Sequence, residues 1–104
     1  MYYTYIVRCF DNSLYTGITT DLERRMREHR EGTGAKYTAS HRVTAICAAW
    51  QSEDRSNASR LENYIKMLKK AQKEALITGE ASLFDLIPVD TEAYERVDVT
   101  DIIK

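Results

Sequence analysis

The chain has 104 residues and a mass of 12.0 kDa, which suits one small domain with a single modest core. Hydrophobic residues make up 43% of it and charged residues 30%, a balance that is ordinary for a globular protein and argues against a disordered chain. No apolar run approaches the roughly 20 residues that span a bilayer, so we expect no membrane partner. The start, MYYTY, lacks the basic and apolar segments of a signal peptide. Two cysteines are too few for a disulfide scaffold, and we expect reduced thiols in the cytoplasm.

The formal net charge of −1 hides an uneven distribution of charge along the chain. Residues 1–83 carry 13 Lys and Arg against 10 Asp and Glu, whereas residues 84–104 carry 2 against 6. We therefore expect one domain over 1–83 and an acidic C-terminal extension over 84–104. The basic balance of the domain permits a phosphate-binding surface.

The first part of the chain predicts a β-hairpin. Residues 2–9, YYTYIVRC, are rich in aromatic and β-branched side chains, as is typical of a strand. Turn-forming residues 10–13 separate them from a second strand over 14–18. Gly17 lies inside this second strand, which indicates that another group approaches the backbone closely there.

The next elements follow from capping signals and apolar periodicity. Thr20 and Glu23 fit a capping box, which predicts a helix to about Glu31 with Thr20 as its N-cap. Gly32, Thr33 and Gly34 then predict a flexible loop.

The second half of the chain predicts a strand and two more helices. The strand covers 44–50, and the helices cover about 57–68 and 71–78. The segment 96–103 fits either an extra strand or a frayed end. The order β-β-α-β-α-α predicts an α+β fold, in which a small three-stranded, largely antiparallel sheet is flanked by about three helices.

Two polar side chains lie on the apolar face of the first helix. Arg25 and His29 share this face with Leu22 and Met26, at helical spacing. Burial of an unpaired guanidinium is costly, so an arginine at this position is unusual. Either Arg25 extends to the edge of the face and His29 interacts with the helix C-terminus, or both side chains belong to a site.

Glu62 lies at the margin of the apolar stripe of the following helix, beside Leu61 and Ile65. Ser59 and Glu62 also fit a capping box, in which the carboxylate would bind the backbone of residue 59. The pattern alone leaves this role and a metal-binding or catalytic role open.

Together these pieces resemble the GIY-YIG nuclease domain. Tyr3-Thr4-Tyr5 matches the first half-motif, and Tyr15-Thr16-Gly17 matches the second. The helix segment TTDLERRMREH and the later segment SRLENYIK complete the set. The run SLYTGITTDLERRMREH, followed by GTGAKYT, is similar to the short, stand-alone bacterial YhbQ-like branch of that family. The resemblance covers about residues 2–77, with Tyr3 in place of the first glycine and Thr4 at the middle position.

The resemblance implies a metal-dependent endonuclease that hydrolyses phosphodiester bonds, structure-selective on DNA, in repair or recombination. Gly17 is implied to be structural. The implied catalytic residues are Tyr5, Tyr15, Arg25, His29 and Glu62.

The resemblance also implies a role for each catalytic residue. Tyr15 acts as the general base and Tyr5 orients it or the attacking water. Arg25 binds the scissile phosphate, and His29 hydrogen-bonds the phosphate or the base tyrosine. Glu62 holds one Mg²⁺ or Mn²⁺ ion.

Several basic residues near this site in the sequence are candidates for nucleic-acid binding, although they also fit a solvated surface. They are Arg24, Arg27, Arg30, Lys36 and Arg42. We find no basic segment with interleaved aromatic residues, the pattern typical of single-strand stacking. So small a domain is expected to bind weakly and to recognise structure more than sequence, and it could require a homodimer or an accessory protein. Two other functions remain open, namely a nucleic-acid-binding module with little or no cleavage and a protein-interaction module that retains the fold.

Overall fold

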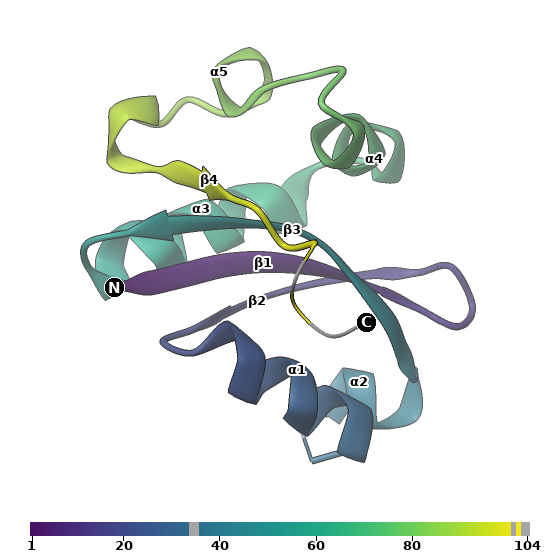
Figure 1. Ribbon diagram of the computed structural model, residues 1–104. Helices are drawn as coiled ribbons and strands as arrows, with labels where there is room; N and C mark the ends of the chain where they lie inside the picture. The colour runs from purple at the N-terminus through teal and green to yellow at the C-terminus, as the bar shows by residue number, and fades with distance from the viewer. Residues whose placement is uncertain (34–35, 101, 103–104) are drawn as a thin grey trace.

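The structure is a computed structural model that describes residues 1–33, 36–100 and 102. Within these residues, four antiparallel strands form one sheet in the order β2-β1-β3-β4, with helices on both faces (Figure 1). The expected α+β class is thus confirmed. Gly34 of the expected loop, and residues 101, 103 and 104 of the expected extension, lie outside the described residues.

The expected hairpin, helices and central strand are all present, and the structure adds two short helices, a 3-10 turn and a fourth strand. In chain order the elements are β1 (Tyr2–Cys9), β2 (Leu14–Thr19), α1 (Leu22–Glu31), α2 (Lys36–Ser40), β3 (Val43–Ser52), α3 (Arg55–Met67), α4 (Lys70–Thr78), α5 (Leu83–Leu86), the 3-10 turn η1 (Thr91–Ala93) and β4 (Glu95–Val97). None of the described helices is long and apolar enough to cross a membrane.

The N-caps of α1 and α3 differ from those expected. Asp21, not Thr20, caps α1, because its carboxylate accepts a hydrogen bond from the Arg24 N–H at 3.1 Å. Asp54 caps α3 in the same way, through the N–H of Asn57 at 2.7 Å.

The early start of α3 removes one of the two interpretations of Glu62, and its metal-binding or catalytic role stays a prediction. Ser59 lies within the helix Arg55–Met67 and cannot be its N-cap, so the capping-box interpretation is wrong. Glu62 is instead a mid-helix residue whose carboxylate lies 3.1 Å from the Lys66 ammonium, one turn later.

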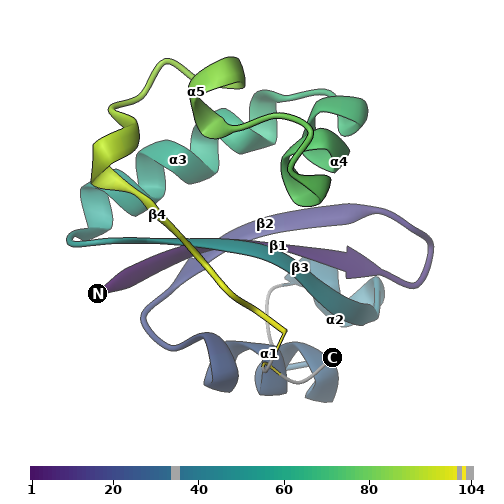
Figure 2. The ribbon, with the colours of Figure 1, turned by 45° about the horizontal axis from the view of Figure 1, so that its top comes forward.

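The sheet separates two cores. On one face, Ile6 of β1 packs with Leu61 and Ile65 of α3, and α4 and α5 extend the same layer. On the other face, Val7 of β1 packs with Met26 of α1. Figures 1 and 2 show α3, α4 and α5 on one side of the sheet, and α1 and α2 on the other.

The segment after α4 packs along the far edge of the sheet. β4 pairs with β3, with Val97 opposite Ala49, so the strand alternative for the segment 96–103 holds only at its first two residues, and residues 98–100 lie outside any strand. The Arg96 guanidinium lies over the ring of Trp50, 5.5 Å from its centroid, and donates to the carbonyl oxygen of Leu76 at 2.7 Å. β4 thus occupies the edge of the sheet opposite β2.

Candidate functional site

The Tyr5 side chain lies against Gly17 of the neighbouring strand β2. The two residues face each other in the β1–β2 pairing, and the Tyr5 side chain is completely buried. A Cβ atom on residue 17 would lie 2.6 Å from the Tyr5 hydroxyl and 3.2 Å from the Tyr15 ring. The expected close approach at Gly17 is therefore confirmed, since only a glycine leaves room for the Tyr5 ring.

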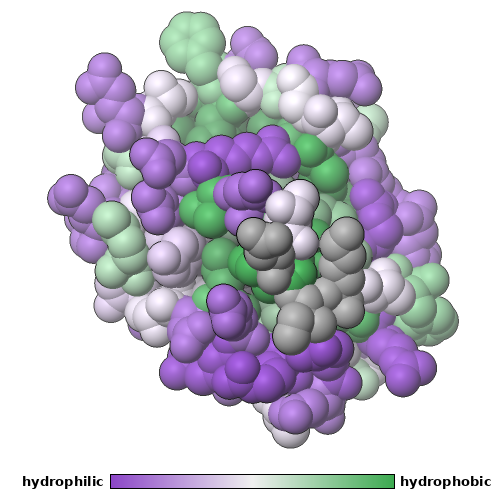
Figure 3. All heavy atoms as spheres, viewed as in Figure 1, coloured by the Kyte–Doolittle hydropathy of each residue, from purple (hydrophilic) through white to green (hydrophobic). Residues whose placement is uncertain are grey.

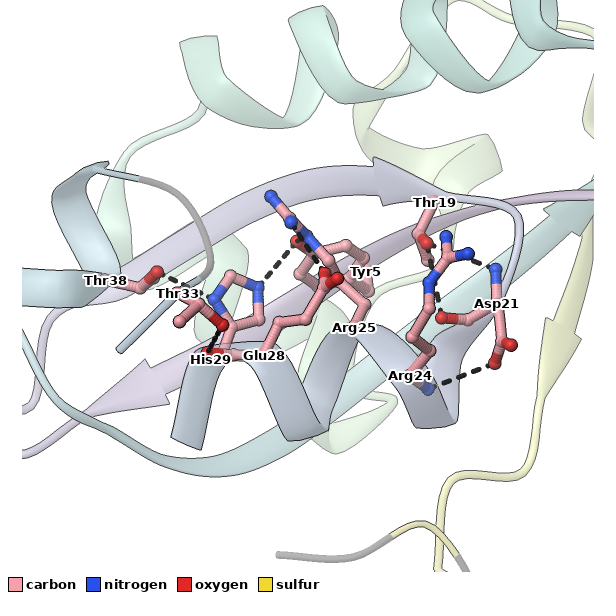
Figure 4. Close-up of polar contacts among 9 residues, drawn as sticks. All are labelled: Tyr5, Thr19, Asp21, Arg24, Arg25, Glu28, His29, Thr33 and Thr38. Carbon is pink, nitrogen blue, oxygen red and sulfur yellow. Dashed lines mark hydrogen bonds and ion pairs between the residues drawn. The ribbon is translucent and has the colours of Figure 1, made fainter. Parts of the chain in front are cut away.

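Helix α1 brings Arg25 and His29 to the hydroxyl of Tyr5. His29 Nε2 lies 2.8 Å from Tyr5 Oη, and Arg25 Nε donates to the same oxygen at 3.3 Å. Figure 4 shows both side chains pointing from the helix toward Tyr5. Their i and i+4 spacing places them on the helix face that meets the sheet. Arg25 and His29 therefore share one hydrogen-bond network with Tyr5, and their membership of a functional site stays a prediction.

His29 forms the buried end of this network. Its Nδ1 lies 2.7 Å from the hydroxyl of Thr38 in α2, and the side chain is buried. Burial and the positive charge of Arg25 lower the pKa of His29 to about 4. The imidazole is therefore neutral at pH 7, with one nitrogen donating and the other accepting. The hydrogen bonds among Tyr5, His29 and Thr38 can therefore run in either direction, with either the Tyr5 or the Thr38 hydroxyl donating to the imidazole.

Tyr5 keeps its proton at neutral pH. Burial raises its pKa to about 12, although the hydrogen bond and charge of Arg25 lower it in part. The charges of Tyr15 and Glu62 also raise the pKa of Tyr5. Tyr5 is thus a hydrogen-bonding group, and Glu62 lies within electrostatic range of its hydroxyl.

Arg25 is half-buried and only partly engaged. Its Nη1 lies 3.0 Å from the Glu28 carboxylate, and its Nε binds Tyr5, which fixes the plane of the guanidinium. Among the residues that the structure describes, none binds Nη2 of Arg25. Nη2 is therefore an available hydrogen-bond donor on a guanidinium whose position is fixed. Such a donor is suited to bind a phosphate oxygen.

Glu62 lies on the opposite side of the sheet from Arg25 and His29, and its charge acts on the Tyr5 hydroxyl. It lies on α3, which packs against β1 and β2, and its side chain is 18% exposed and paired with Lys66. In the described part of the chain, no group of three His, Cys, Asp or Glu side chains is arranged to hold a metal ion. A single half-buried carboxylate fits a hard cation that keeps several waters and takes further oxygen ligands from a substrate phosphate.

Tyr15 completes the cluster on β2. Its ring centroid lies 6.5 Å from that of Tyr5 and 5.9 Å from that of His29, which it meets edge to face. Tyr5, Tyr15, Arg25 and His29 thus meet at the β2 side of the sheet.

The structure adds polar and aromatic neighbours that the sequence analysis missed. Thr38 and Tyr37 come from the unexpected helix α2, and Glu28 lies one turn from Arg25. Tyr37 lies within the segment GAKYT that resembles the YhbQ-like branch, and no helix was expected there.

The five candidate nucleic-acid-binding residues are all exposed. Three of them lie on the outward side of α1, which forms the hydrophilic band at the bottom of Figure 3. The other two flank α2, at its first residue and just beyond its end. They are Arg24, Arg27 and Arg30 on α1, then Lys36 and Arg42.

The sequence matches one family model and several known proteins. The family model described as "GIY-YIG catalytic domain" matches residues 1–75. The UPF0213 protein YhbQ of Salmonella arizonae is 45% identical over 83% of this chain and 86% of its own length. The UPF0213 protein VNG_2274C of Halobacterium salinarum is 43% identical over 73% of this chain and 99% of its own length. The solution NMR structure of the UPF0213 protein BH0048 from Bacillus halodurans is 35% identical, covers 85% of this chain and 95% of that one, and superimposes with a TM-score of 0.48.

Proposed function

We propose that this chain, which belongs to the GIY-YIG family of nuclease domains and to its stand-alone YhbQ-like branch, is a metal-dependent endonuclease. Its proposed substrate is DNA of particular structure, in repair or recombination. The observation that carries the proposal is the network in which Arg25 and His29 converge on the buried Tyr5 hydroxyl. Neither an apolar core nor a partner-binding surface requires this arrangement. We place the activity in the cytoplasm, which the free thiols of Cys9 and Cys47 favour.

Arg25 is proposed to bind the scissile phosphate. Its Nε and Nη1 are fixed by Tyr5 and Glu28, so Nη2 can donate to a phosphate oxygen with little loss of side-chain entropy. A fixed guanidinium stabilises the extra negative charge that develops on the phosphate in the transition state.

Tyr15 is proposed as the group that accepts a proton from the attacking water, with Tyr5 as its orienting partner. A free tyrosine has a pKa near 10, so formation of its phenolate at pH 7 costs about 4 kcal/mol. Tyr5 is unsuited to this role because burial raises its pKa to about 12. As a protonated phenol held by His29 and Arg25, Tyr5 can instead fix the position of the water or of the Tyr15 ring.

Glu62 is proposed to hold one Mg²⁺ or Mn²⁺ ion. When bound, such an ion neutralises phosphate charge and stabilises the departing oxygen. Lys66 must release the Glu62 carboxylate, or share it, for the ion to bind. One carboxylate gives weak affinity, so we expect binding to depend on the substrate phosphate.

The exposed basic residues on α1 and around α2 are proposed to follow the DNA backbone. They are Arg24, Arg27, Arg30, Lys36 and Arg42. A surface of this size gives salt-sensitive and weakly sequence-dependent binding. A homodimer or an accessory protein would extend it.

The test is cleavage of a panel of nicked, flapped, branched, single-stranded and fully paired DNA with Mg²⁺, with Mn²⁺ and with a chelator. We expect the wild-type protein to cut selected branched or flapped substrates only with a divalent ion. Arg25→Ala and Glu62→Gln should each lose about 100-fold or more in rate, because each removes a charge that acts on the transition state.

Arg60→Ala is the matched control, since Arg60 is an exposed arginine that lies outside the proposed site. It should cleave at the wild-type rate. Full activity of the folded Arg25→Ala or Glu62→Gln protein would contradict the proposed site. Salt-dependent DNA binding by a wild-type protein that never cuts would favour a binding module, and absence of both would favour a protein-interaction module.

A further inference from the structure

Three aromatic rings lead from the candidate site to the protein surface. The rings of Tyr15 and Tyr37 lie nearly parallel, with an interplanar angle of 13° and centroids 5.8 Å apart. Tyr37 and His41 stack at 3.9 Å with an angle of 1°. These three residues, from β2, α2 and the segment after α2, are called the aromatic stack below. Because Tyr15 also meets His29, the stack is continuous with the candidate site.

The outer two rings of the stack are held rigidly although they contribute little to the core. Tyr37 is 38% exposed, and neither Tyr37 nor His41 belongs to the two apolar clusters of the sheet. The Tyr37 hydroxyl donates to Ser13 at 2.9 Å, which fixes its ring. A flat aromatic surface that is both fixed and exposed is suited to a planar ligand, because the entropy of ordering its side chains is already lost.

His41 presents a ring face at the outer end of the stack. Its Nδ1 lies 3.0 Å from the Tyr37 carbonyl oxygen and 3.1 Å from the Ser40 hydroxyl, and its Nε2 lies 4.0 Å from the Asp11 carboxylate. All of these contacts are made at the ring edge. One face of the ring is covered by Tyr37, the opposite face points away from the stack, and the side chain is 36% exposed.

Basic residues flank Tyr37 and His41 in the sequence. Lys36 precedes Tyr37 and Arg42 follows His41, and both are exposed. Flat aromatic rings beside such cations are the combination with which proteins bind unpaired nucleotides, since the base stacks and the phosphate meets the cation. The sequence alone does not reveal this stack, because Tyr15 is distant in the chain from Tyr37 and the rings meet only in the fold.

We propose that the aromatic stack binds an unpaired nucleobase of the DNA strand next to the scissile phosphate, with His41 as the outer stacking surface. This inference rests on the proposed function and gives it a substrate class, namely DNA with an unpaired nucleotide at the cleavage position, as in a flap or a branch. Tyr37 and His41 are positioning residues in this scheme, since they hold the strand while Arg25 binds its phosphate.

The test is a binding measurement in a chelator, so that no strand is cut. The first probe is a DNA hairpin with a single-stranded arm whose first unpaired base is a fluorescent adenine analogue that is quenched when it stacks. The second probe is the same hairpin without the arm. The variants are His41→Leu, which removes the ring, and His41→Phe, which keeps it. Phe84→Leu is the control for loss of an exposed aromatic ring, because Phe84 is 79% exposed and lies on α5, on the other side of the sheet.

We expect His41→Leu to bind the armed hairpin about 10-fold more weakly, without quenching, and to bind the blunt hairpin as the wild type does. His41→Phe and Phe84→Leu should behave as the wild type on both probes. Tyr37→Leu should act like His41→Leu, and its melting curve shows whether α2 is retained. Since His41 lies at the surface, His41→Leu keeps the test valid even if Tyr37→Leu fails to fold.

The inference is overturned if His41→Leu retains both quenching and affinity, or if it loses the same affinity for both probes. Its failure is distinguishable from failure of the proposed function. If the wild-type protein cuts DNA while His41→Leu binds normally, the proposed nuclease activity stands and the proposed stacking site is excluded. If stacking depends on His41 but the wild-type protein never cuts DNA, the proposed stacking site stands and the proposed nuclease activity is excluded.

Discussion

On the α3 side of the sheet, Ile6 packs with Leu61 and Ile65 among apolar side chains, whereas on the α1 side its neighbour Tyr5 is hydrogen-bonded to His29 and Arg25. The two residues are consecutive in β1, and strand geometry sends them to opposite faces. In the described residues every buried side-chain nitrogen and oxygen has a hydrogen-bond partner, so the polar side is fully satisfied.

The two sides are expected to contribute unequally to stability. A fully buried Leu or Ile contributes about 1.5–3 kcal/mol, whereas a buried hydrogen bond contributes about 1 kcal/mol net. The α3 side should therefore contribute most of the stability, whereas Tyr5, Arg25 and His29 of the candidate site lie on the α1 side. Four measurements test this division.

Leu61→Ala should have the largest effect on stability, about 4 kcal/mol, because it opens a cavity in a completely buried part of the α3 side. Urea unfolding at pH 7 measures it. Met67→Ala, at a position of the same helix that is 78% exposed, should change the free energy of unfolding by less than about 0.5 kcal/mol. A loss below about 1 kcal/mol for Leu61→Ala would show that α3 is not the main support.

His29 should make stability depend on pH. Its pKa is about 4 in the folded protein and 6.5 in the unfolded chain, so the unfolded chain binds more protons between these values. Stability is therefore full above pH 6.5 and falls by roughly 3 kcal/mol as the pH falls to 4. Comparison with His29→Gln isolates this effect from that of the carboxylates. Parallel pH curves for the two proteins would contradict a buried neutral imidazole.

Gly17→Ala should cost about 2 kcal/mol and most of the cleavage activity, because the new methyl group would displace the Tyr5 ring and separate its hydroxyl from His29. Gly32→Ala is the control for a glycine replacement without contact. No heavy atom of the described residues lies within 4 Å of its added Cβ, but its φ of 76° strains an alanine, so about 1 kcal/mol should be lost with activity retained. Equal activities of the two variants would contradict the role of Gly17.

Tyr94→Phe should have the smallest effect, about 1 kcal/mol, from loss of the hydrogen bond that the Tyr94 hydroxyl donates to the Asn57 carbonyl oxygen at 2.7 Å. This bond ties the C-terminal segment to α3. Tyr64→Phe, in which no described hydrogen bond is lost, should be close to neutral in thermal unfolding. If the two variants melt together, the segment is held by other contacts.

The parts of the fold with strong local signals could be predicted from the sequence. The observed bounds of β1, Tyr2–Cys9, are those expected, because an uninterrupted run of aromatic and β-branched residues ends at a turn. β4 and α2 are short, at three and five residues, and depend on distant partners such as β3 and the ring of Tyr15. Such elements have little periodicity to detect.

The candidate site, too, could be predicted from the sequence only in part. Arg25 and His29 could be singled out because they lie on an apolar helix face, and Gly17 because it interrupts a strand. The stacking of Tyr37 on Tyr15 could not, since it joins residues far apart in the chain. The catalytic roles of Tyr15 and Glu62 remain predictions that the cleavage assay tests.

The contact between Arg96 and Trp50 allows the fluorescence of Trp50 to report on the position of β4. Trp50 is the single tryptophan of the sequence, and it is buried beneath Arg96 of β4. Detachment of the last strand would admit water to the indole and move its fluorescence emission to longer wavelength. An unlabelled sample in a spectrofluorimeter can therefore follow the docking of the C-terminal segment, separately from any reaction at the other edge of the sheet.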